Sequence, residues 1–267
     1  MKSARQPSSL PVTEEVAGTQ TIARSLSVLR VLRDAEQDLG VTEIARGLGL
    51  NASTTHRILK ALVAAGYVAQ NTQSERYRLG REAFLLGHAA RRTLGLEAAM
   101  TSLERLAEET GESVNLVIRD GSAGLVVLRV ESRHPLRFTQ PTGTRIPLYC
   151  TSSGKALLAF AADYRAEVAA LPDLRQLTST TLTSPQQLLL DLERTRERGF
   201  SVNRAERIPG VCGIAAPVLD AHGLAIAALA VQGPEVRIPD DRIPALGALV
   251  IEIAQAVRDA IPAGYQI

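Results

Sequence analysis

The chain has 267 residues, of which 45% are hydrophobic and 22% charged, and this composition predicts a folded globular protein of two domains. Its apolar runs are much shorter than the roughly 18 residues that span a bilayer, and residues 1–15 lack the apolar core of a signal peptide. We therefore expect a cytoplasmic protein without membrane contact. Cys150 and Cys212 are too few for a disulfide framework and stand in no metal-binding spacing, so we expect buried, reduced thiols and neither a metal nor a cofactor.

The net charge of +2 hides an asymmetry along the chain. Residues 20–94 hold eleven Lys and Arg against six Asp and Glu, a net charge of +5. Residues 95–267 hold 17 against 20, a net charge of −3. Because a basic region suits a polyanionic partner, the N-terminal part of the chain is where a nucleic-acid contact is expected.

Apolar spacing and turn residues predict a tail, three helices and a hairpin in the first 80 residues. Residues 1–19 have no periodicity and predict a disordered tail. The first expected helix begins at Thr21, and the second and third cover residues 42–48 and 51–65. The expected strands are residues 67–70 and 76–79. Gly49 stands in the short turn between the second and third helices, an arrangement typical of a helix-turn-helix.

The third predicted helix has the features of a DNA-recognition helix. Asn51 is a good N-cap, and the first turns carry short polar and basic side chains that suit base edges and phosphates in a major groove. The candidate DNA-binding residues are Ser53, Thr54, His56, Arg57 and Lys60 on this helix, and Arg76 and Arg78 on the hairpin. Trihelical units also serve as protein-interaction modules, but the basic helix and the arginine-bearing hairpin together favour DNA binding. The sequence therefore predicts a winged helix-turn-helix over residues 20–80.

The pattern changes after a predicted linker helix at residues 81–96. The expected elements are helices at 97–110, near 154–162, at 185–198 and at 240–260, with strands at 113–119, 124–130, 210–219 and 224–231. Short strands joined by turns, with helices on one or both faces, predict an α+β domain around an antiparallel sheet at residues 97–267.

Four ordered segments resemble the IclR family of bacterial transcriptional regulators. They are VTEIARGLGLNASTTHRILKALVAAGYV with YRLG after it, RIPLYCTSSGKALLAF, ERGFSVNRAERIPGVCGIAAPV and LAIAALAVQGP. The resemblance covers nearly the whole chain from about Thr19. It implies a winged helix-turn-helix, a linker helix and a GAF-like effector-binding and oligomerisation domain. It also implies a homodimer, or a dimer of dimers, on a palindromic operator in double-stranded DNA. Thr55 departs from the family, which usually has Val there, and its hydroxyl needs a partner.

Residues 151–155 invite two enzymatic interpretations, and both fail. A Walker A loop would need Gly at Tyr149 and Ser or Thr at Ala156. The S-x-x-K spacing from Ser152 to Lys155 lacks the companion motifs S-D-N and K-T-G. The small residues instead predict a helix N-terminus whose backbone N–H groups can hold a carboxylate without a side-chain cation, or which is simply capped by Thr151 or Ser152.

The resemblance places effector contacts at this turn and on later strands. The candidate effector-binding residues are Leu148, Tyr149, Ser152, Ser153, Gly154, Asn203, Val211, Gly213, Ala230 and Gln232, with Phe138 as a further wall. Relatives that bind small keto acids tend to have an acid, a Cys and two Ser at four of these places. This chain has Asn203, Gly213, Ala230 and Gln232 there. We therefore expect a roomier, partly apolar pocket for an organic acid larger than pyruvate, for example an aromatic acid.

The sequence as a whole predicts a ligand-responsive DNA-binding regulator of a catabolic or metabolic operon. The alternative is an enzyme or metabolite sensor built on the C-terminal domain, with the N-terminal unit serving only for dimerisation. Residues 96–267 show no paired acid and base or nucleophile and base, which favours the regulator. His134, His222 and Cys150 are too far apart in sequence to predict a metal site, and nothing beside Cys212 indicates a redox role.

Overall fold

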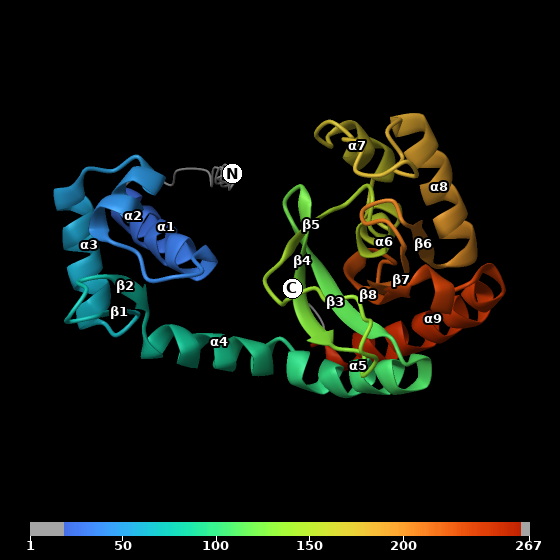
Figure 1. The fold of residues 1–267 in the computed structure, drawn as a ribbon, viewed down its shortest axis with the longest axis horizontal. Coiled ribbons are helices and arrows are strands. Elements are labelled where there is room, and N and C mark those ends of the chain that lie inside the picture. The colour runs from blue at the N-terminus through green and yellow to red at the C-terminus, as the bar shows by residue number, and fades with distance from the viewer. Residues whose placement is uncertain (1–18, 263–267) are drawn as a thin grey trace. The chain divides into compact units, whose positions relative to one another are not determined.

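The computed structural model describes residues 19–262, which form two compact units that divide between Arg91 and Arg92 (Figure 1). The predicted tail lies outside the described residues, apart from Thr19. The first unit contains α1 (Gln20–Asp34), α2 (Val41–Leu48), α3 (Ala52–Ala64), β1 (Val68–Gln70), β2 (Tyr77–Leu79) and all but the last two residues of α4 (Arg81–Thr93). Over the described range, no helix is both long and apolar enough to cross a membrane.

The first unit is the winged helix-turn-helix that the sequence predicts. Ile44 and Ile58 are buried in its core, and Leu48 and Leu62 are half-buried against it. Gly49 ends α2 with a φ of +63°, a left-handed conformation that favours glycine and turns the chain into α3. The strands β1 and β2 pair antiparallel, which confirms the hairpin.

The predicted linker helix ends earlier than expected. α4 stops at Thr93, and α5 (Leu96–Thr110) begins after Gly95, whose φ is +71°. Gly95 lies against the carbonyl of Ala260, where a side chain would collide with it. Leu96 is 5% exposed and belongs to the core of the second unit rather than to the linker. Apolar spacing continues through this point, so periodicity does not reveal the break.

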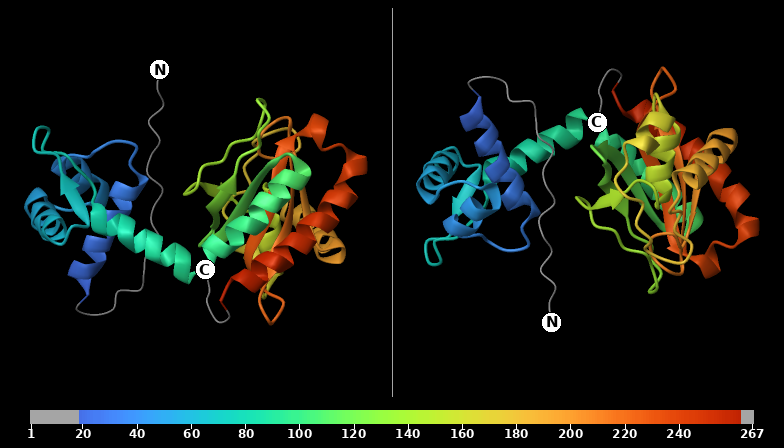
Figure 2. Two further views of the ribbon diagram at one scale, coloured as in Figure 1. Left: turned by 90° about the horizontal axis from the view of Figure 1, so that it is seen from below. Right: turned by 90° about the horizontal axis from the view of Figure 1, so that it is seen from above.

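The second unit is a six-stranded sheet with helices on both faces (Figures 1 and 2). The strands follow the order β5-β4-β3-β8-β7-β6, and every neighbouring pair is antiparallel. After α5 come β3 (Ser113–Asp120), β4 (Ala123–Val130), β5 (Arg145–Pro147), α6 (Ser152–Ala159), α7 (Tyr164–Ala169), α8 (Pro185–Arg198), β6 (Ser201–Arg204), β7 (Val211–Leu219), β8 (Ala225–Pro234), two short 3₁₀ turns (Glu235–Arg237 and Asp240–Arg242) and α9 (Ile243–Ala260).

Alternation along the strands divides the unit into two cores. Leu229 and Val231 of β8 face α5 and α9, whereas Ala228 and Ala230 face α6. The small residues allow α6 to lie close to the sheet. The α+β class is thus confirmed, but β5, β6 and α7, which have three, four and six residues, were not predicted. The last helix begins at Ile243 rather than at residue 240 because a 3₁₀ turn precedes it.

Candidate DNA interface and ligand pocket

The predicted cap fixes the start of α3. The Asn51 side chain accepts a hydrogen bond from the Thr54 backbone N–H at 2.7 Å, and the Ser53 hydroxyl donates to the same oxygen at 2.9 Å. Such a cap satisfies one of the N–H groups that a helix start leaves without a partner. The first turn of α3 is therefore held by its own side chains.

One face of α3 is buried and the opposite face is polar. Thr55, Ile58 and Leu59 are buried, and the Thr55 hydroxyl donates to the Asn51 carbonyl at 3.0 Å, so it has the partner that it needs. Of the five residues predicted to contact DNA from this helix, Thr54 is half-buried, and the exposed ones are Ser53, His56, Arg57 and Lys60. α3 contains no Asp or Glu, and its exposed residues combine the polar and basic Ser53, His56, Arg57 and Lys60 with small or apolar residues such as Ala61 and Val63.

The two hairpin arginines have different environments. Arg78 is exposed on β2. The Arg76 guanidinium donates to the Asp38 carbonyl through Nε and to the Glu43 carboxylate through Nη2, both at 2.7 Å. The same Glu43 oxygen accepts the Gly40 backbone N–H, and this bond, reinforced by Arg76, lowers the pKa of Glu43. Arg76 therefore ties the hairpin to the start of α2, a role that the sequence does not indicate.

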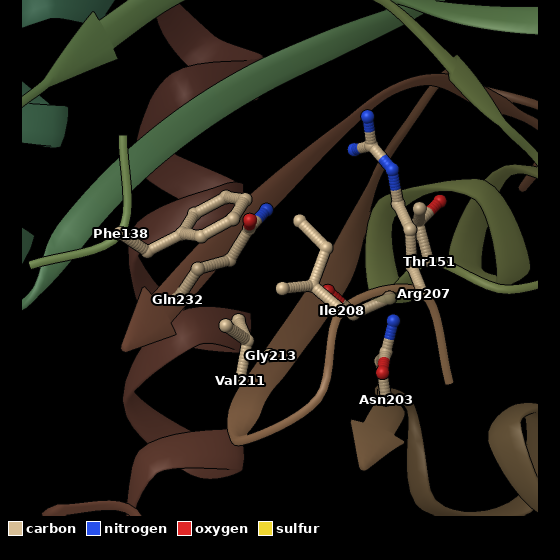
Figure 3. A pocket seen from close by; sticks show the side chains of 9 residues that line it. Phe138, Thr151, Asn203, Arg207, Ile208, Val211, Gly213 and Gln232 are labelled. Carbon is tan, nitrogen blue, oxygen red and sulfur yellow. The ribbon is translucent and has the colours of Figure 1, made fainter. Parts of the chain in front are cut away.

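A small cavity lies where the start of α6 meets β7 (Figure 3). It is lined by Phe138, Thr151, Ser152, Asn203, Arg207, Ile208, Val211, Gly213 and Gln232. Its volume is about 20 Å³, close to the space of one water molecule. In Figure 3, Phe138 and Gln232 lie on one side of Ile208, and Arg207 and Thr151 lie on the other.

The start of α6 is both capped and closely packed on the sheet. The Thr151 hydroxyl accepts the Gly154 N–H at 3.1 Å and donates to the Pro147 carbonyl at 2.7 Å. A Cβ on Gly213 would lie 2.7 Å from the Ser152 hydroxyl oxygen, so only glycine allows this approach. The backbone N–H groups of Ser152 and Ser153 have no hydrogen-bond partner among residues 19–262. They remain available to an anion at the helix N-terminus.

Half of the predicted effector contacts line this cavity. They are Ser152, Asn203, Val211, Gly213 and Gln232. The others are buried without lining it, and they are Leu148, Tyr149, Ser153, Gly154 and Ala230. The roomy pocket that the sequence predicts is absent here, because Ser152 occupies the space beside Gly213 and Ala230 packs into the core under α6.

Arg207 is a charged lining residue that the sequence analysis missed, together with the neighbouring Ile208. It stands in the loop between β6 and β7, and burial lowers the pKa of its guanidinium. No carboxylate among the described residues forms an ion pair or a hydrogen bond with it. The backbone N–H groups of α6 are predicted from the sequence as a carboxylate site that needs no side-chain cation, and the structure places a cation on the lining of this cavity as well. Neither periodicity nor a charge count tells where a loop side chain folds.

The lysine of the S-x-x-K spacing forms ion pairs with two carboxylates. Lys155 is 1% exposed, and its Nζ lies 2.6 Å from Glu206 and 2.9 Å from Asp191. An ammonium held by two carboxylates cannot take a proton from Ser152, which agrees with the rejection of a serine nucleophile. The ion cluster instead fastens the loop that carries Arg207 to α6 and α8.

The cysteines are buried free thiols, as expected. Burial raises the pKa of Cys150 and of Cys212 to about 11, so both are protonated at neutral pH and unsuited to redox sensing. Within the part of the chain that the structure describes, no group of three or more His, Cys, Asp and Glu side chains could hold a metal ion.

Two family models match separate stretches of the chain. The IclR helix-turn-helix domain matches residues 21–72, and the bacterial transcriptional regulator IclR C-terminal domain matches residues 89–259. The chain is 38% identical over 245 residues to the HTH-type transcriptional regulator BhcR of Paracoccus denitrificans, covering 91% of this chain and 87% of that protein. It is 33% identical over 262 residues to the transcriptional repressor IclR of Escherichia coli, covering 96% and 94%.

The fold also matches that of a solved relative. An IclR homologue of Microbacterium hydrocarbonoxydans, complexed with 4-hydroxybenzoate, has a TM-score of 0.77 at 23% identity, over 90% of this chain and 98% of that one. At this identity the structural similarity establishes the fold alone. The family models and the regulators of higher identity establish the family. Both relatives are named as transcriptional regulators of a non-enzymatic family, and the helix-turn-helix model matches the stretch of this chain that contains α3. The chain belongs to the IclR family of bacterial transcriptional regulators.

Proposed function

We propose that this regulator controls a catabolic or metabolic operon and that binding of a small organic acid changes its affinity for the operator DNA. The observation that carries the proposal is α3, a capped helix in a helix-turn-helix that exposes His56, Arg57 and Lys60 and contains no acidic residue. A cytoplasmic location, where the chromosome is accessible, is part of the proposal.

The proposed DNA contacts divide into two kinds. Side chains at the start of α3 face the base edges of a major groove, and cations farther along and on the hairpin contact phosphates. The residues are Ser53, Thr54, His56, Arg57 and Lys60 on α3, with Arg78 on the hairpin. Arg76 positions the hairpin through Glu43 rather than contacting a phosphate.

The proposed effector site is the cavity at the start of α6. The free N–H groups of Ser152 and Ser153 suit a carboxylate, and the homologue complexed with 4-hydroxybenzoate supports an aromatic acid as one candidate. Since the cavity is only about 20 Å³, binding of such an acid requires Ile208 or Phe138 to move. Ile208 is 38% exposed, so its side chain borders solvent into which it would turn.

A homodimer, or a dimer of dimers, on a palindromic operator completes the proposal. Exposed apolar side chains on α1 and α4 support an interface between copies, with Ile22 62%, Phe84 71% and Leu86 60% exposed. Two recognition helices related by a two-fold axis would read a palindrome, and effector binding would change their spacing. Such coupling requires the effector to bind one arrangement more tightly than the other.

Titration of the purified protein against its own upstream DNA, at several salt concentrations, tests the proposal. We expect a sequence-dependent complex whose affinity falls steeply with salt, because phosphate contacts release counterions. Analytical ultracentrifugation of the same samples gives the oligomeric state. A protein that binds no DNA above the level of unrelated sequences would support the alternative, in which the N-terminal unit serves only for dimerisation.

A further inference from the structure

Arg207 carries a charge that the fold leaves without a counter-ion. It is the one charged side chain on the cavity lining, and no acidic side chain lines the cavity beside it. The side chain is half-buried, and this burial lowers the pKa of its guanidinium. The titratable group that acts on it is the Cys150 thiol, which burial keeps neutral by raising its pKa to about 11.

Glu206, the acidic residue next to Arg207 in the sequence, already forms an ion pair with Lys155. Glu206 accepts a hydrogen bond from Lys155 at 2.6 Å, and it does not line the cavity. Its backbone is also fixed, since its N–H donates to the Asn203 side chain at 3.0 Å and its carbonyl accepts the Thr181 hydroxyl at 2.6 Å. The backbone of the loop is thus held in place up to the residue that bears the free cation.

The lining has a charged end and an apolar end. Arg207 and Thr151, the residue that caps α6, lie on the same side of Ile208 in Figure 3, and the ring of Phe138 lies on the other. The unpaired backbone N–H groups at the start of α6 add donors close to Thr151. An acceptor group with a full negative charge fits the first end, and a flat or branched apolar group fits the second.

We propose that Arg207 is the specificity-determining residue of the effector site and forms an ion pair with the carboxylate of an amphipathic monocarboxylic acid. The apolar part of this ligand packs against Phe138, Ile208 and Val211. The inference rests on the effector function proposed above, and it adds a half-buried cation to the backbone N–H groups of the carboxylate site. A neutral ligand of the same shape leaves the half-buried guanidinium without a counter-ion, so the site discriminates by charge.

The test compares matched ligands that differ only in charge. Calorimetry on the full chain uses benzoate, 4-hydroxybenzoate and 3-phenylpropionate, each with its uncharged carboxamide, and pyruvate as a small acid. We expect at least one acid to bind ten or more times more tightly than its amide. Arg207→Gln should remove this preference, because it should lower the affinity for the acid and leave the affinity for the amide unchanged. Arg207→Lys keeps a positive charge and should retain part of the preference.

Arg194→Gln is the matched control, because it removes the same charge from an exposed position on α8. It should leave both affinities unchanged, and circular dichroism should show that all variants are folded. Equal binding of acids and amides by the wild-type protein would overturn the inference, as would an acid preference that survives Arg207→Gln. A protein that binds none of the acids would overturn the organic-acid effector as well, whereas operator binding would stand.

Discussion

The recognition helix and the effector cavity are built in opposite ways. The functional side chains of α3 are consecutive in sequence and exposed, and the core beneath them is made by other residues of the same helix. The cavity is assembled from residues between 138 and 232, most of which are also buried packing residues. Substitutions on α3 should therefore change binding without unfolding the protein, whereas substitutions around the cavity should affect stability and binding together.

The largest effect is expected from Lys155→Met. This change leaves Glu206 and Asp191 facing each other with no cation between them, and breaking a buried ion pair in this way costs about 3–5 kcal/mol. Urea unfolding monitored by circular dichroism measures the loss. The control Arg165→Gln breaks the more exposed pair with Glu193 and should change stability by less than about 1 kcal/mol. Similar losses in both variants would contradict the importance of burial.

Arg57→Ala should weaken operator binding strongly and leave effector affinity unchanged. Arg57 is exposed on α3 and belongs to the other unit from the cavity. A lost base or phosphate contact of this kind costs about 1–3 kcal/mol, or roughly a 5- to 150-fold change in affinity. Fluorescence anisotropy with operator DNA measures the first quantity and calorimetry measures the second. An equal loss of both would contradict the division of labour between the units.

Asn51→Ala should destabilise the first unit by about 1 kcal/mol, because the Thr54 N–H loses its acceptor. The decrease should appear in thermal unfolding of the N-terminal unit. Asn51→Asp keeps an acceptor at the cap and should retain the stability. If both variants unfold at the wild-type temperature, the cap is not what fixes the start of α3.

The smallest expected effect is a difference between Arg76 and Arg78 in the salt dependence of operator binding. Arg78→Ala should reduce the slope of log affinity against log salt by about 0.9, the value for one lost phosphate contact. Arg76→Ala should lower affinity modestly with an unchanged slope, because its guanidinium is held by Glu43 and the Asp38 carbonyl. Glu43→Gln should resemble Arg76→Ala. A reduced slope in Arg76→Ala would assign that residue to the phosphates instead.

The sequence predicts features that depend on neighbouring residues better than features that depend on distant ones. The Asn51 cap, the turn at Gly49 and the amphipathic α3 follow from spacing alone, and all are present. The break at Gly95 escapes prediction because its cause is the carbonyl of Ala260, far along the chain. The cavity also escapes prediction, because its lining residues are brought together from distant parts of the chain.

The cavity also shows why small side chains do not predict empty space. The sequence has Gly213 and Ala230 where the family resemblance implies Cys or Ser in members that bind small keto acids, and the expectation of a roomy pocket follows from that implication. In the structure, Ser152 approaches Gly213 and α6 packs down on Ala230, so the space is filled. A side chain that folds in from a loop, as Arg207 does, can be located only once the tertiary structure is known.

The most direct test of the account is to titrate an organic acid that binds the protein into a preformed complex of the protein with its upstream DNA, and to follow the anisotropy of the DNA. The account predicts that the acid changes operator affinity several-fold in the wild-type protein, and that Arg207→Gln retains operator binding but loses this response. An operator affinity that stays constant while calorimetry shows the acid bound would contradict a ligand-responsive regulator.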